Sequence, residues 1–239
     1  MIGRIHSYES LGALDGPGLR YVVFMQGCPL SCGCCHNPDT STFEGGEEIT
    51  PHELYATVEK YRPYFGTEGG ITASGGEPLC QAEFLSEVFS LCRDGGITTC
   101  LDTSGYMLSE TVEKLLDLTD TVLLDIKYSC DEDYVKYTGM SYSAVIDFLK
   151  VLDKKGINTV LRRVIIPGLN DKPEDSECLV ELSQKYSCVK KVELLPFKKF
   201  CTEKYERLGI PFPFAHIPEP DPEAVKKEEA RISELIKIS

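Results

Sequence analysis

The sequence of 239 residues contains no tryptophan and no long apolar run. A helix that crosses a membrane needs about 18 consecutive apolar residues, and no segment approaches that length. The first residues, Met1-Ile2-Gly3-Arg4, lead directly into mixed polar sequence without the apolar core of a signal peptide. We therefore expect a cytoplasmic protein that has no membrane partner.

Basic residues are also scarce relative to acidic ones. The chain has 25 Lys and Arg against 38 Asp and Glu, which gives a net charge of −13. Because binding to phosphate backbones requires a surplus of Lys and Arg, we expect no nucleic-acid partner. We interpret the acidity as a source of solubility.

A second metal-ligand pair is missing as well, although cysteine is abundant. The chain has eleven cysteines, an odd number, and no later Cys-x2-Cys or His-x3-His spacing. A secreted disulfide framework and a zinc site built from two ligand pairs are both disfavoured. Seven cysteines are scattered through mostly apolar segments and are interpreted as small buried hydrophobes. These seven are Cys80, Cys92, Cys100, Cys130, Cys178, Cys188 and Cys201.

Short apolar runs alternate with stretches of helical period six times along the chain. The predicted strands are residues 20–26, 70–74, 98–103, 121–127, 158–166 and 189–195, and the predicted helices are 51–65, 82–93, 110–118, 143–155, 174–186 and 223–238. Such alternation predicts an α/β fold with a parallel sheet. Six units are too few for a closed eightfold barrel, so the sheet is either open and doubly wound or an incomplete barrel. No linker divides the chain, and we expect one domain over residues 1–239.

Polar and charged clusters follow the ends of the predicted strands. In parallel β/α folds, sites form where the strands end and the loops enter the helices. Cysteines follow the first strand, residues 74–77 follow the second and residues 102–105 follow the third. Residues 125–127 end the fourth strand, Arg162 lies on the fifth, and residues 196–198 follow the sixth. The sequence therefore predicts one site at this edge of the sheet.

The densest cluster is a cysteine-rich segment after the first strand. Cys28, Cys32 and Cys35 have the spacing Cys-x3-Cys-x2-Cys. A four-iron cluster normally takes four thiolates, so three would leave one iron open to a ligand such as S-adenosylmethionine (AdoMet). Cys34 breaks this spacing, although other triples remain open. A structural zinc site and an inert cysteine-rich loop are the alternatives.

The spacing resembles the signature of the radical AdoMet superfamily, and longer motifs resemble its glycyl radical enzyme activases. These motifs are residues 3–7, 15–20, 26–28, 35–37, 72–77, 100–105 and 193–196. The resemblance covers residues 3 to about 196. The chain lacks the insertion that carries extra ferredoxin-like clusters in some activases, which favours the branch that activates pyruvate formate-lyase.

The resemblance implies a partial (β/α)6 barrel of the radical AdoMet type, with a [4Fe-4S] cluster on Cys28, Cys32 and Cys35. The residues that it implies for AdoMet are Cys34, Cys35, His36, Gly75, Gly76, Glu77, Asp102, Asp125, Ile126, Lys127, Arg162 and Lys198. It also implies a monovalent-cation site at Asp102, Thr103 and Asp125. Lys198 stands where the family commonly has a histidine, and Phe197 where it often has a tyrosine.

Some of these residues have ordinary structural interpretations. Gly75 and Gly76 alone suit a turn, and Asp102 suits a helix cap. Asp125 and Lys127 lie two positions apart on one face of an apolar strand, where two charges are rarely structural. We therefore favour a functional interpretation for that pair.

The implied activity is the generation of a radical in a partner, a glycyl radical enzyme of the pyruvate formate-lyase type. A flavodoxin or ferredoxin reduces the cluster, AdoMet is cleaved, and a hydrogen atom is taken from a glycine of the partner. A patch of Lys190, Lys191, Lys198, Lys199 and Lys204 is a candidate docking surface for the acidic electron carrier. The alternatives are an activase of another glycyl radical enzyme, a small-molecule radical AdoMet enzyme and a non-catalytic iron–sulfur redox sensor.

Overall fold

The computed structural model describes residues 1–237, which fall into two compact units. Unit 1 contains residues 1–29 and 40–123, and unit 2 contains residues 30–39 and the described residues from 124 onward. The boundary falls inside a strand and inside the cysteine-rich segment, so neither unit is a continuous piece of chain. The expectation of one domain over 1–239 remains a prediction.

The strands form an open sheet whose hydrogen-bonded order is β3-β1-β2-β4-β5-β6-β7-β8. Their bounds are β1 Gly3–Gly12, β2 Arg20–Met25, β3 Glu47–Ile49, β4 Gly70–Gly75, β5 Thr98–Thr103, β6 Thr121–Asp125, β7 Asn158–Ile165 and β8 Val189–Pro196. The pairs β2–β4, β4–β5 and β7–β8 are parallel. In the described chain β3 and β8 end the order, so the sheet does not close, and the expected α/β fold of the partial-barrel type is confirmed.

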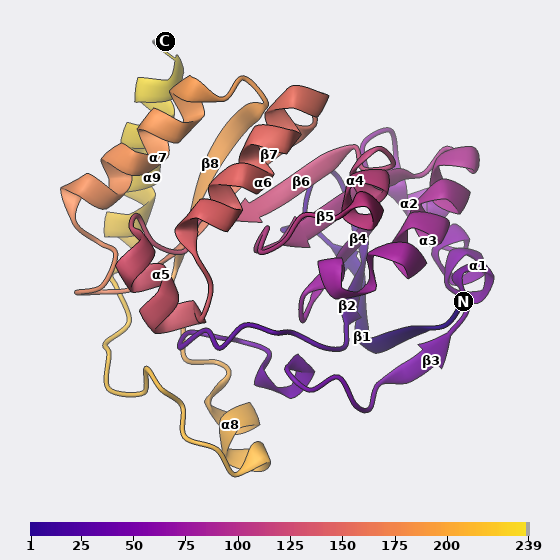
Figure 1. Ribbon diagram of the computed structural model, residues 1–239, viewed down its shortest axis with the longest axis horizontal. Coiled ribbons are helices and arrows are strands. Elements are labelled where there is room, and N and C mark those ends of the chain that lie inside the picture. Colours follow the sequence, from indigo (N-terminus) through magenta and orange to yellow (C-terminus); the bar gives the residue numbers. More distant parts are fainter. Residues whose placement is uncertain (238–239) are drawn as a thin grey trace. The chain divides into compact units, whose positions relative to one another are not determined.

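The helices follow the strands as expected (Figure 1). Their bounds are α1 Pro51–Glu59, α2 Arg62–Phe65, α3 Ala82–Asp94, α4 Glu110–Leu116, α5 Asp131–Thr138, α6 Tyr142–Lys155, α7 Pro173–Lys185, α8 Thr202–Leu208 and α9 Pro222–Lys237, with 3-10 turns at Pro38–Thr40 and Pro78–Gln81. Thr50 caps α1 in a reciprocal capping box with Glu53. Residue 238, the predicted end of the last helix, lies outside the described residues.

In unit 1 the buried Arg20 ties together the amino ends of the parallel strands. Its guanidinium donates to the Thr72 hydroxyl at 3.0 Å, to the Thr98 hydroxyl at 2.7 Å and to the Ile71 carbonyl at 2.5 Å. A buried guanidinium is stable only when its donors are satisfied, as they are here. Arg20 ends the motif at residues 15–20, so this part of the family motif supports the sheet at the end opposite the predicted site.

In unit 2 the outer layer is formed by α7 and α9, which pack on each other and on β8 (Figure 1). The amphipathic α9 buries Val225 and Ile232. A carboxylate oxygen of Glu229 on α9 also accepts a hydrogen bond from the Leu194 backbone at 2.9 Å. This contact satisfies a donor of β8, which is the last strand in the described order.

Several elements differ from the sequence prediction. The antiparallel strands β1 and β3 were not predicted, because β1 is interrupted by polar residues and β3 has only three residues. The helices α5 and α8 were not predicted either, since each is short and has few apolar residues. The predicted helix 51–65 is two helices, which are separated at Lys60-Tyr61 because Pro63 has no N–H to donate to the carbonyl of Glu59, four residues before it.

Candidate functional site

The cysteine loop of unit 2 makes a tight turn. The backbone amide of Cys35 donates to the carbonyl of Cys32 at 3.2 Å, so these two predicted ligands start from one turn. Two α5 carbonyls hold the turn, since Ser31 donates to Thr138 at 3.0 Å and Gly33 donates to Tyr137 at 3.2 Å. The loop is thus fixed by backbone hydrogen bonds to a helix that the sequence analysis missed.

A second set of contacts ties the same loop to the segment around α8. The Tyr205 hydroxyl donates to the carbonyl of Cys35 at 3.2 Å. An imidazole nitrogen of His36 lies 2.9 Å from the carbonyl of Lys198. The Lys204 ammonium contacts the Asn37 side chain at 2.8 Å and the Asp39 carboxylate at 3.2 Å. Residues after β8 therefore help to fix the cysteine loop.

Cys34 has different surroundings from its neighbours. It packs against an apolar cluster that includes Ile166, Phe197 and Phe214. Burial, followed by the nearby Cys32, raises the pKa of Cys34 to about 12. Such a site favours the neutral thiol and disfavours the thiolate that binds metal. The structure thus supports a packing role for Cys34, as its departure from the ligand spacing suggested.

The three predicted cluster ligands belong to both units, since Cys28 lies in unit 1 while Cys32 and Cys35 lie in unit 2. The described residues contain no group of three His, Cys, Asp or Glu side chains that could hold a metal ion. The chemistry of the donors nevertheless suits an iron–sulfur cluster. All three are half-buried thiols, and no disulfide occurs among the described cysteines.

The glycines after β4 in unit 1 allow close packing of backbones. A side chain at Gly76 would place its Cβ 2.3 Å from the carbonyl oxygen of Gly27, and one at Gly75 would come 2.5 Å from the backbone of Met25. Gly75 also has φ = +99°, which favours glycine. The Glu77 amide donates to the Gly27 carbonyl at 2.9 Å, so this stretch lies directly against the residue before Cys28.

The Glu77 carboxylate is buried and turned into unit 1. It accepts hydrogen bonds from the Thr103 hydroxyl at 2.6 Å, the Ser104 hydroxyl at 2.5 Å and amide at 3.0 Å, and the Leu79 amide at 3.1 Å. Burial raises the pKa of Glu77, and these hydrogen bonds oppose that shift. We expected this carboxylate to bind the AdoMet ammonium, but both carboxylate oxygens of Glu77 already accept hydrogen bonds within unit 1. The backbone of Gly75 and Gly76 is the better candidate for that contact.

Asp102 and Thr103 form the carboxyl end of β5 in unit 1. Asp102 accepts a hydrogen bond from the Ser74 hydroxyl at 2.7 Å, which links the ends of β4 and β5. The Thr103 hydroxyl is used by Glu77. Asp102 therefore does not act as a helix cap, since α4 is capped by Ser109. Its part in a cation site with Asp125, which lies in unit 2, remains a prediction.

Asp125 and Lys127 form an ion pair in unit 2. The Lys127 ammonium lies 2.7 Å from an Asp125 carboxylate oxygen. Burial tends to raise the pKa of Asp125, but the charges of Lys127 and Arg162 outweigh burial and lower it. Asp125 in turn outweighs burial and raises the pKa of Lys127. Both groups are therefore charged, although Lys127 lies beyond the end of β6 and not on the strand as predicted.

The predicted residues Ile126 and Arg162 are joined through their backbones. The Ile126 amide donates to the Arg162 carbonyl at 2.8 Å, and the Ile126 side chain is buried in the core. The Ile126 carbonyl accepts from Arg163 at 2.7 Å. A ligand could therefore contact Ile126 only through atoms that are already buried or hydrogen-bonded within the protein.

A small cavity in unit 2 gathers several predicted residues. It is lined by Cys34, Asp125, Lys127 and Arg162, together with Tyr128, Arg163, Val164 and Ile166. Its wall thus combines a carboxylate, three cations and apolar surface, and its volume of about 10 Å³ is room for about one water molecule. Four of the predicted AdoMet residues are brought together here within one unit.

Three residues that the sequence analysis did not select position this wall. Asn170 donates to the carbonyls of Lys127 at 2.9 Å and Val164 at 2.8 Å and accepts from the Ile166 amide at 2.7 Å. The Tyr134 hydroxyl accepts from the Lys127 amide at 2.8 Å. Arg163, the third, is bonded to Ile126 as described above. Of these three residues, only Asn170 could have been selected from the sequence, because it is a polar residue shortly after the end of an apolar strand.

Lys198 is half-buried and paired with an acid. Its ammonium lies 2.8 Å from a carboxylate oxygen of Glu219, whose pKa is lowered by that hydrogen bond. The Lys198 backbone carbonyl is the partner of His36. Within the structure, Lys198 therefore joins the cysteine loop through its backbone, while its side chain is committed to Glu219.

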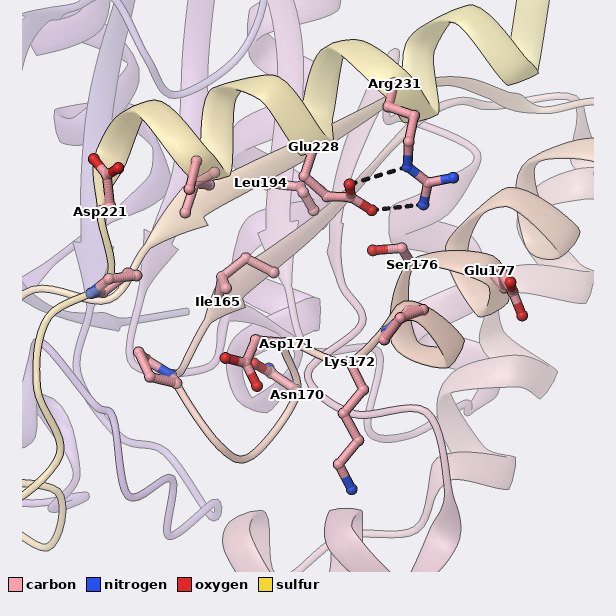
Figure 2. A pocket seen from close by; sticks show the side chains of 15 residues that line it. Ile165, Asn170, Asp171, Lys172, Ser176, Glu177, Leu194, Asp221, Glu228 and Arg231 are labelled. Carbon is pink, nitrogen blue, oxygen red and sulfur yellow. Dashed lines mark hydrogen bonds and ion pairs between the residues drawn. The ribbon is translucent and has the colours of Figure 1, made fainter.

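A larger pocket of about 520 Å³ also lies in unit 2, between α7, α9 and the ends of β7 and β8. Figure 2 shows Ile165 and Leu194 at its floor and the Glu228–Arg231 ion pair on its wall. None of the described residues that line this pocket belongs to the predicted site. Size alone therefore does not identify the functional site in this chain.

Comparison with known proteins agrees with the resemblance in the motifs. The model of the radical SAM superfamily, where SAM is AdoMet, matches residues 22–177. The chain is 44% identical over 237 residues to the pyruvate formate-lyase-activating enzyme of Clostridium pasteurianum, covering 99% of each chain. It is 38% identical over 230 residues to the pyruvate formate-lyase 1-activating enzyme of Escherichia coli K12, covering 95% of this chain and 94% of that one.

Solved structures show the same fold at low identity. A domain of pyruvate-formate lyase-activating enzyme from Bacteroides vulgatus aligns with a TM-score of 0.57 and 19% identity over 70% of this chain and 94% of that chain. A radical SAM methyltransferase from Sphaerobacter thermophilus aligns with a TM-score of 0.64 and 17% identity over 92% of this chain and 64% of that chain. The chain therefore belongs to the radical SAM superfamily and, within it, to the family of pyruvate formate-lyase-activating enzymes.

Proposed function

We propose that this protein activates a glycyl radical enzyme of the pyruvate formate-lyase type. The observation that carries this proposal is the near-complete match to activating enzymes in both sequence and length. Those relatives are named for pyruvate formate-lyase, and we propose the same substrate for this chain. The cysteine loop and the charged cavity of unit 2 supply the chemistry that such an activity requires.

The cofactors of the superfamily are a [4Fe-4S] cluster and AdoMet. We propose Cys28, Cys32 and Cys35 as the cluster ligands. A reduced cluster held by these residues would supply the electron for cleavage of AdoMet, and that cleavage would provide the radical chemistry needed to remove a hydrogen atom from a glycine of the partner. No side chain of this chain need act as an acid or a base in that reaction.

The remaining residues bind and orient AdoMet. The paired Asp125 and Lys127 present opposite charges in the cavity of unit 2, and Cys34 contributes an apolar wall. The glycine backbone at Gly75 and Gly76 is proposed for the amino group. Fixed charges in a half-buried site hold a charged ligand in one orientation and reduce the access of water to a reactive intermediate. A monovalent cation at Asp102, Thr103 and Asp125 is part of the same proposal.

We further propose a cytoplasmic location and a flavodoxin or ferredoxin as electron donor. No helix among the described residues is long and apolar enough to cross a membrane. The lysine patch has fewer free charges than the sequence suggested, because three of its lysines form ion pairs. Lys191 pairs with Glu193, Lys198 with Glu219 and Lys204 with Asp39. Lys199 contacts the Ala215 carbonyl, and its neighbour Phe200 is 82% exposed. Lys199 and Phe200 are therefore the proposed docking residues.

The function is tested by anaerobic incubation of the protein with AdoMet and dithionite, with and without pyruvate formate-lyase. Formation of 5′-deoxyadenosine distinguishes an AdoMet-cleaving enzyme from an iron–sulfur sensor. We expect one 5′-deoxyadenosine for each partner site that is activated. No cleavage under reducing conditions would contradict the proposal, and cleavage that is indifferent to the partner would favour the small-molecule alternative.

A further inference from the structure

The long loop between α8 and α9 in unit 2 (Figure 1) contains a segment, residues 210–219, that we call the strap. Three of its side chains, Phe212, Phe214 and Ile217, are buried. They supply three of the seven buried side chains in the apolar cluster against which Cys34 packs. The strap is therefore part of the surroundings of the cysteine loop.

Phe214 packs directly on the cysteine loop. A Cβ atom at Gly33 would collide with the Phe214 ring, so the ring lies on the backbone between Cys32 and Cys34. The Tyr137 ring on α5 meets the Phe214 ring nearly edge to face, with centroids 5.8 Å apart. Since the Gly33 amide donates to the Tyr137 carbonyl, Phe214 covers the turn of the loop that α5 holds.

Glu219 fixes the end of the strap to the residues that follow β8. Its carboxylate accepts hydrogen bonds from the Lys198 ammonium at 2.8 Å and from the Lys199 amide at 2.9 Å. The Lys199 ammonium donates to the Ala215 carbonyl at 2.7 Å. The Lys198 carbonyl is in turn the partner of His36, next to the cysteine loop. The strap and the cysteine loop are therefore attached to the same short segment.

The backbone of the strap has few hydrogen bonds to the rest of unit 2. The amides of Ala215 and Ile217 donate to carbonyls within the strap, and the Ile210 amide donates to Tyr205 of the adjoining α8. Among the described residues, no backbone–backbone hydrogen bond joins the strap to a strand. Three prolines limit bending within it. A segment that is held mainly by side chains opens at a lower free energy than the core.

We propose that the strap controls the rate at which the cysteine loop takes up and releases its iron, and that Phe214 and Glu219 keep the strap closed. The inference rests on the proposed function only in taking Cys28, Cys32 and Cys35 as cluster ligands. A closed strap holds the turn of the loop in place and covers it from solvent. Phe214 and Glu219 are thus positioning residues that act through the loop.

The thiol of Cys201 reports the opening of the strap without any cluster. Cys201 is 2% exposed and belongs to the same apolar cluster as Phe212 and Phe214. In the cofactor-free protein under native conditions, an alkylating reagent reaches this thiol when the strap opens, and peptide mass spectrometry measures the rate. Cys188 is equally buried but precedes β8 and lies outside this cluster. Its labelling measures general unfolding in the same sample.

The variants should accelerate the labelling of Cys201 to different extents. Phe214→Ala should label more than roughly tenfold faster than the wild type, because a large buried side chain is lost. Glu219→Ala should label several-fold faster, since a partly exposed ion pair contributes modestly. Glu219→Gln, which keeps an acceptor for the Lys199 amide, should fall between Glu219→Ala and the wild type.

The controls make this measurement decisive. Glu223→Ala, which removes an exposed pair with Lys226, should leave the Cys201 rate unchanged. The Cys188 rate should not change in any variant. Equal Cys201 rates in the wild type and in the Phe214 and Glu219 variants would overturn the proposal, as would an equal increase at Cys188.

A second measurement uses the cluster-loaded protein. Transfer of iron to a ferrous chelator under anaerobic conditions should become faster in the same order, Glu219→Gln, Glu219→Ala and Phe214→Ala, from the same initial iron content. Unchanged iron release in variants that label faster at Cys201 would overturn the role of the strap in iron exchange. A wild-type protein that fails to cleave AdoMet would instead refute the proposed function, so the two failures are distinguishable.

Discussion

At the scale of single residues, the four cysteines between positions 28 and 35 differ in their surroundings. Cys28, Cys32 and Cys35 are half-buried loop residues, whereas Cys34 packs against the apolar cluster around Phe197. Burial raises the pKa of Cys34 to about 12, which keeps its thiol protonated. Burial raises the pKa of the Cys35 thiol as well, so it is the apolar packing that sets Cys34 apart from the three cysteines proposed as ligands.

We predict that alanine at Cys28, Cys32 or Cys35 removes most of the bound iron, because the cluster would lose one of only three ligands. Cys34→Ala should keep its iron and lose some stability through a smaller packing contact. Iron and sulfide analysis, with visible absorbance, measures this after anaerobic reconstitution. Loss of iron in Cys34→Ala with retention in Cys35→Ala would show that the ligand set is wrong.

The ion pair of Asp125 and Lys127 gives a second prediction at this scale. Asp125→Ala and Lys127→Ala should each weaken AdoMet binding at least tenfold, or about 1.4 kcal/mol, because each variant removes one charge from the cavity. Cluster absorbance should be unchanged. Equilibrium binding to the reconstituted protein measures the affinity, and Lys150→Ala, from an exposed pair with Asp147, is the control. Unchanged affinity in both cavity variants would leave the pair a purely structural role.

At the scale of elements, the fold of the parallel strands followed from the sequence, while the pieces that hold the cysteine loop did not. Strands β4 to β8 read as apolar runs between helical segments, and this pattern is strong. The helices α5 and α8 carry few apolar residues, and their contacts with the loop run through backbone carbonyls and single side chains such as Tyr205. Such contacts leave no periodic signal, because they depend on the tertiary position of each element.

The candidate site likewise contains features that the sequence predicted and features that it did not. The residues at strand ends could be predicted, because parallel strands end at one edge. The direction of the Glu77 side chain could not, since it depends on Thr103 and Ser104 across a loop. The role of Asn170 was also hidden, because its three partners lie just after β6, within β7 and just after β7, and gather only in the folded chain.

Asn170 gives a prediction at the scale of elements. Asn170→Ala should lower the free energy of unfolding by roughly 2 to 3 kcal/mol, because three buried backbone groups lose their partner. It should also weaken AdoMet binding, since one of those groups is the carbonyl of Lys127. Urea unfolding of the cofactor-free protein measures the stability. Asn170→Asp, which keeps the acceptor for Ile166, should fall between; equal stability of Asn170→Ala and the wild type would refute this role.

At the scale of the whole molecule, the net charge of −13 opposes the approach of an acidic electron carrier. Any docking surface must therefore be local; Lys191, Lys198 and Lys204 are paired with acids, whereas Lys199 lies beside the exposed Phe200. This segment precedes α8, whose Tyr205 is hydrogen-bonded to the cysteine loop. The proposed entry point is thus next to an element that is hydrogen-bonded to the cysteine loop.

The double variant Lys199→Glu, Phe200→Ser should slow cluster reduction by flavodoxin several-fold, with a smaller loss at high salt because screening weakens the charge effect. Reduction by dithionite should not change. Stopped-flow absorbance measures both rates, and Lys190→Glu, at the opposite end of β8, is the control. Equal rates of wild type and double variant with flavodoxin at low salt would exclude this surface.

Electron paramagnetic resonance detects the radical that the proposed activity places on a glycine of the partner. Pyruvate formate-lyase is incubated anaerobically with this protein, AdoMet and a reductant, and the spectrum is recorded on frozen samples. We predict a doublet from a glycyl radical, which is absent without AdoMet and absent when the partner's radical-bearing glycine is replaced by alanine. No doublet on the wild-type partner, under conditions in which AdoMet is cleaved, would contradict it.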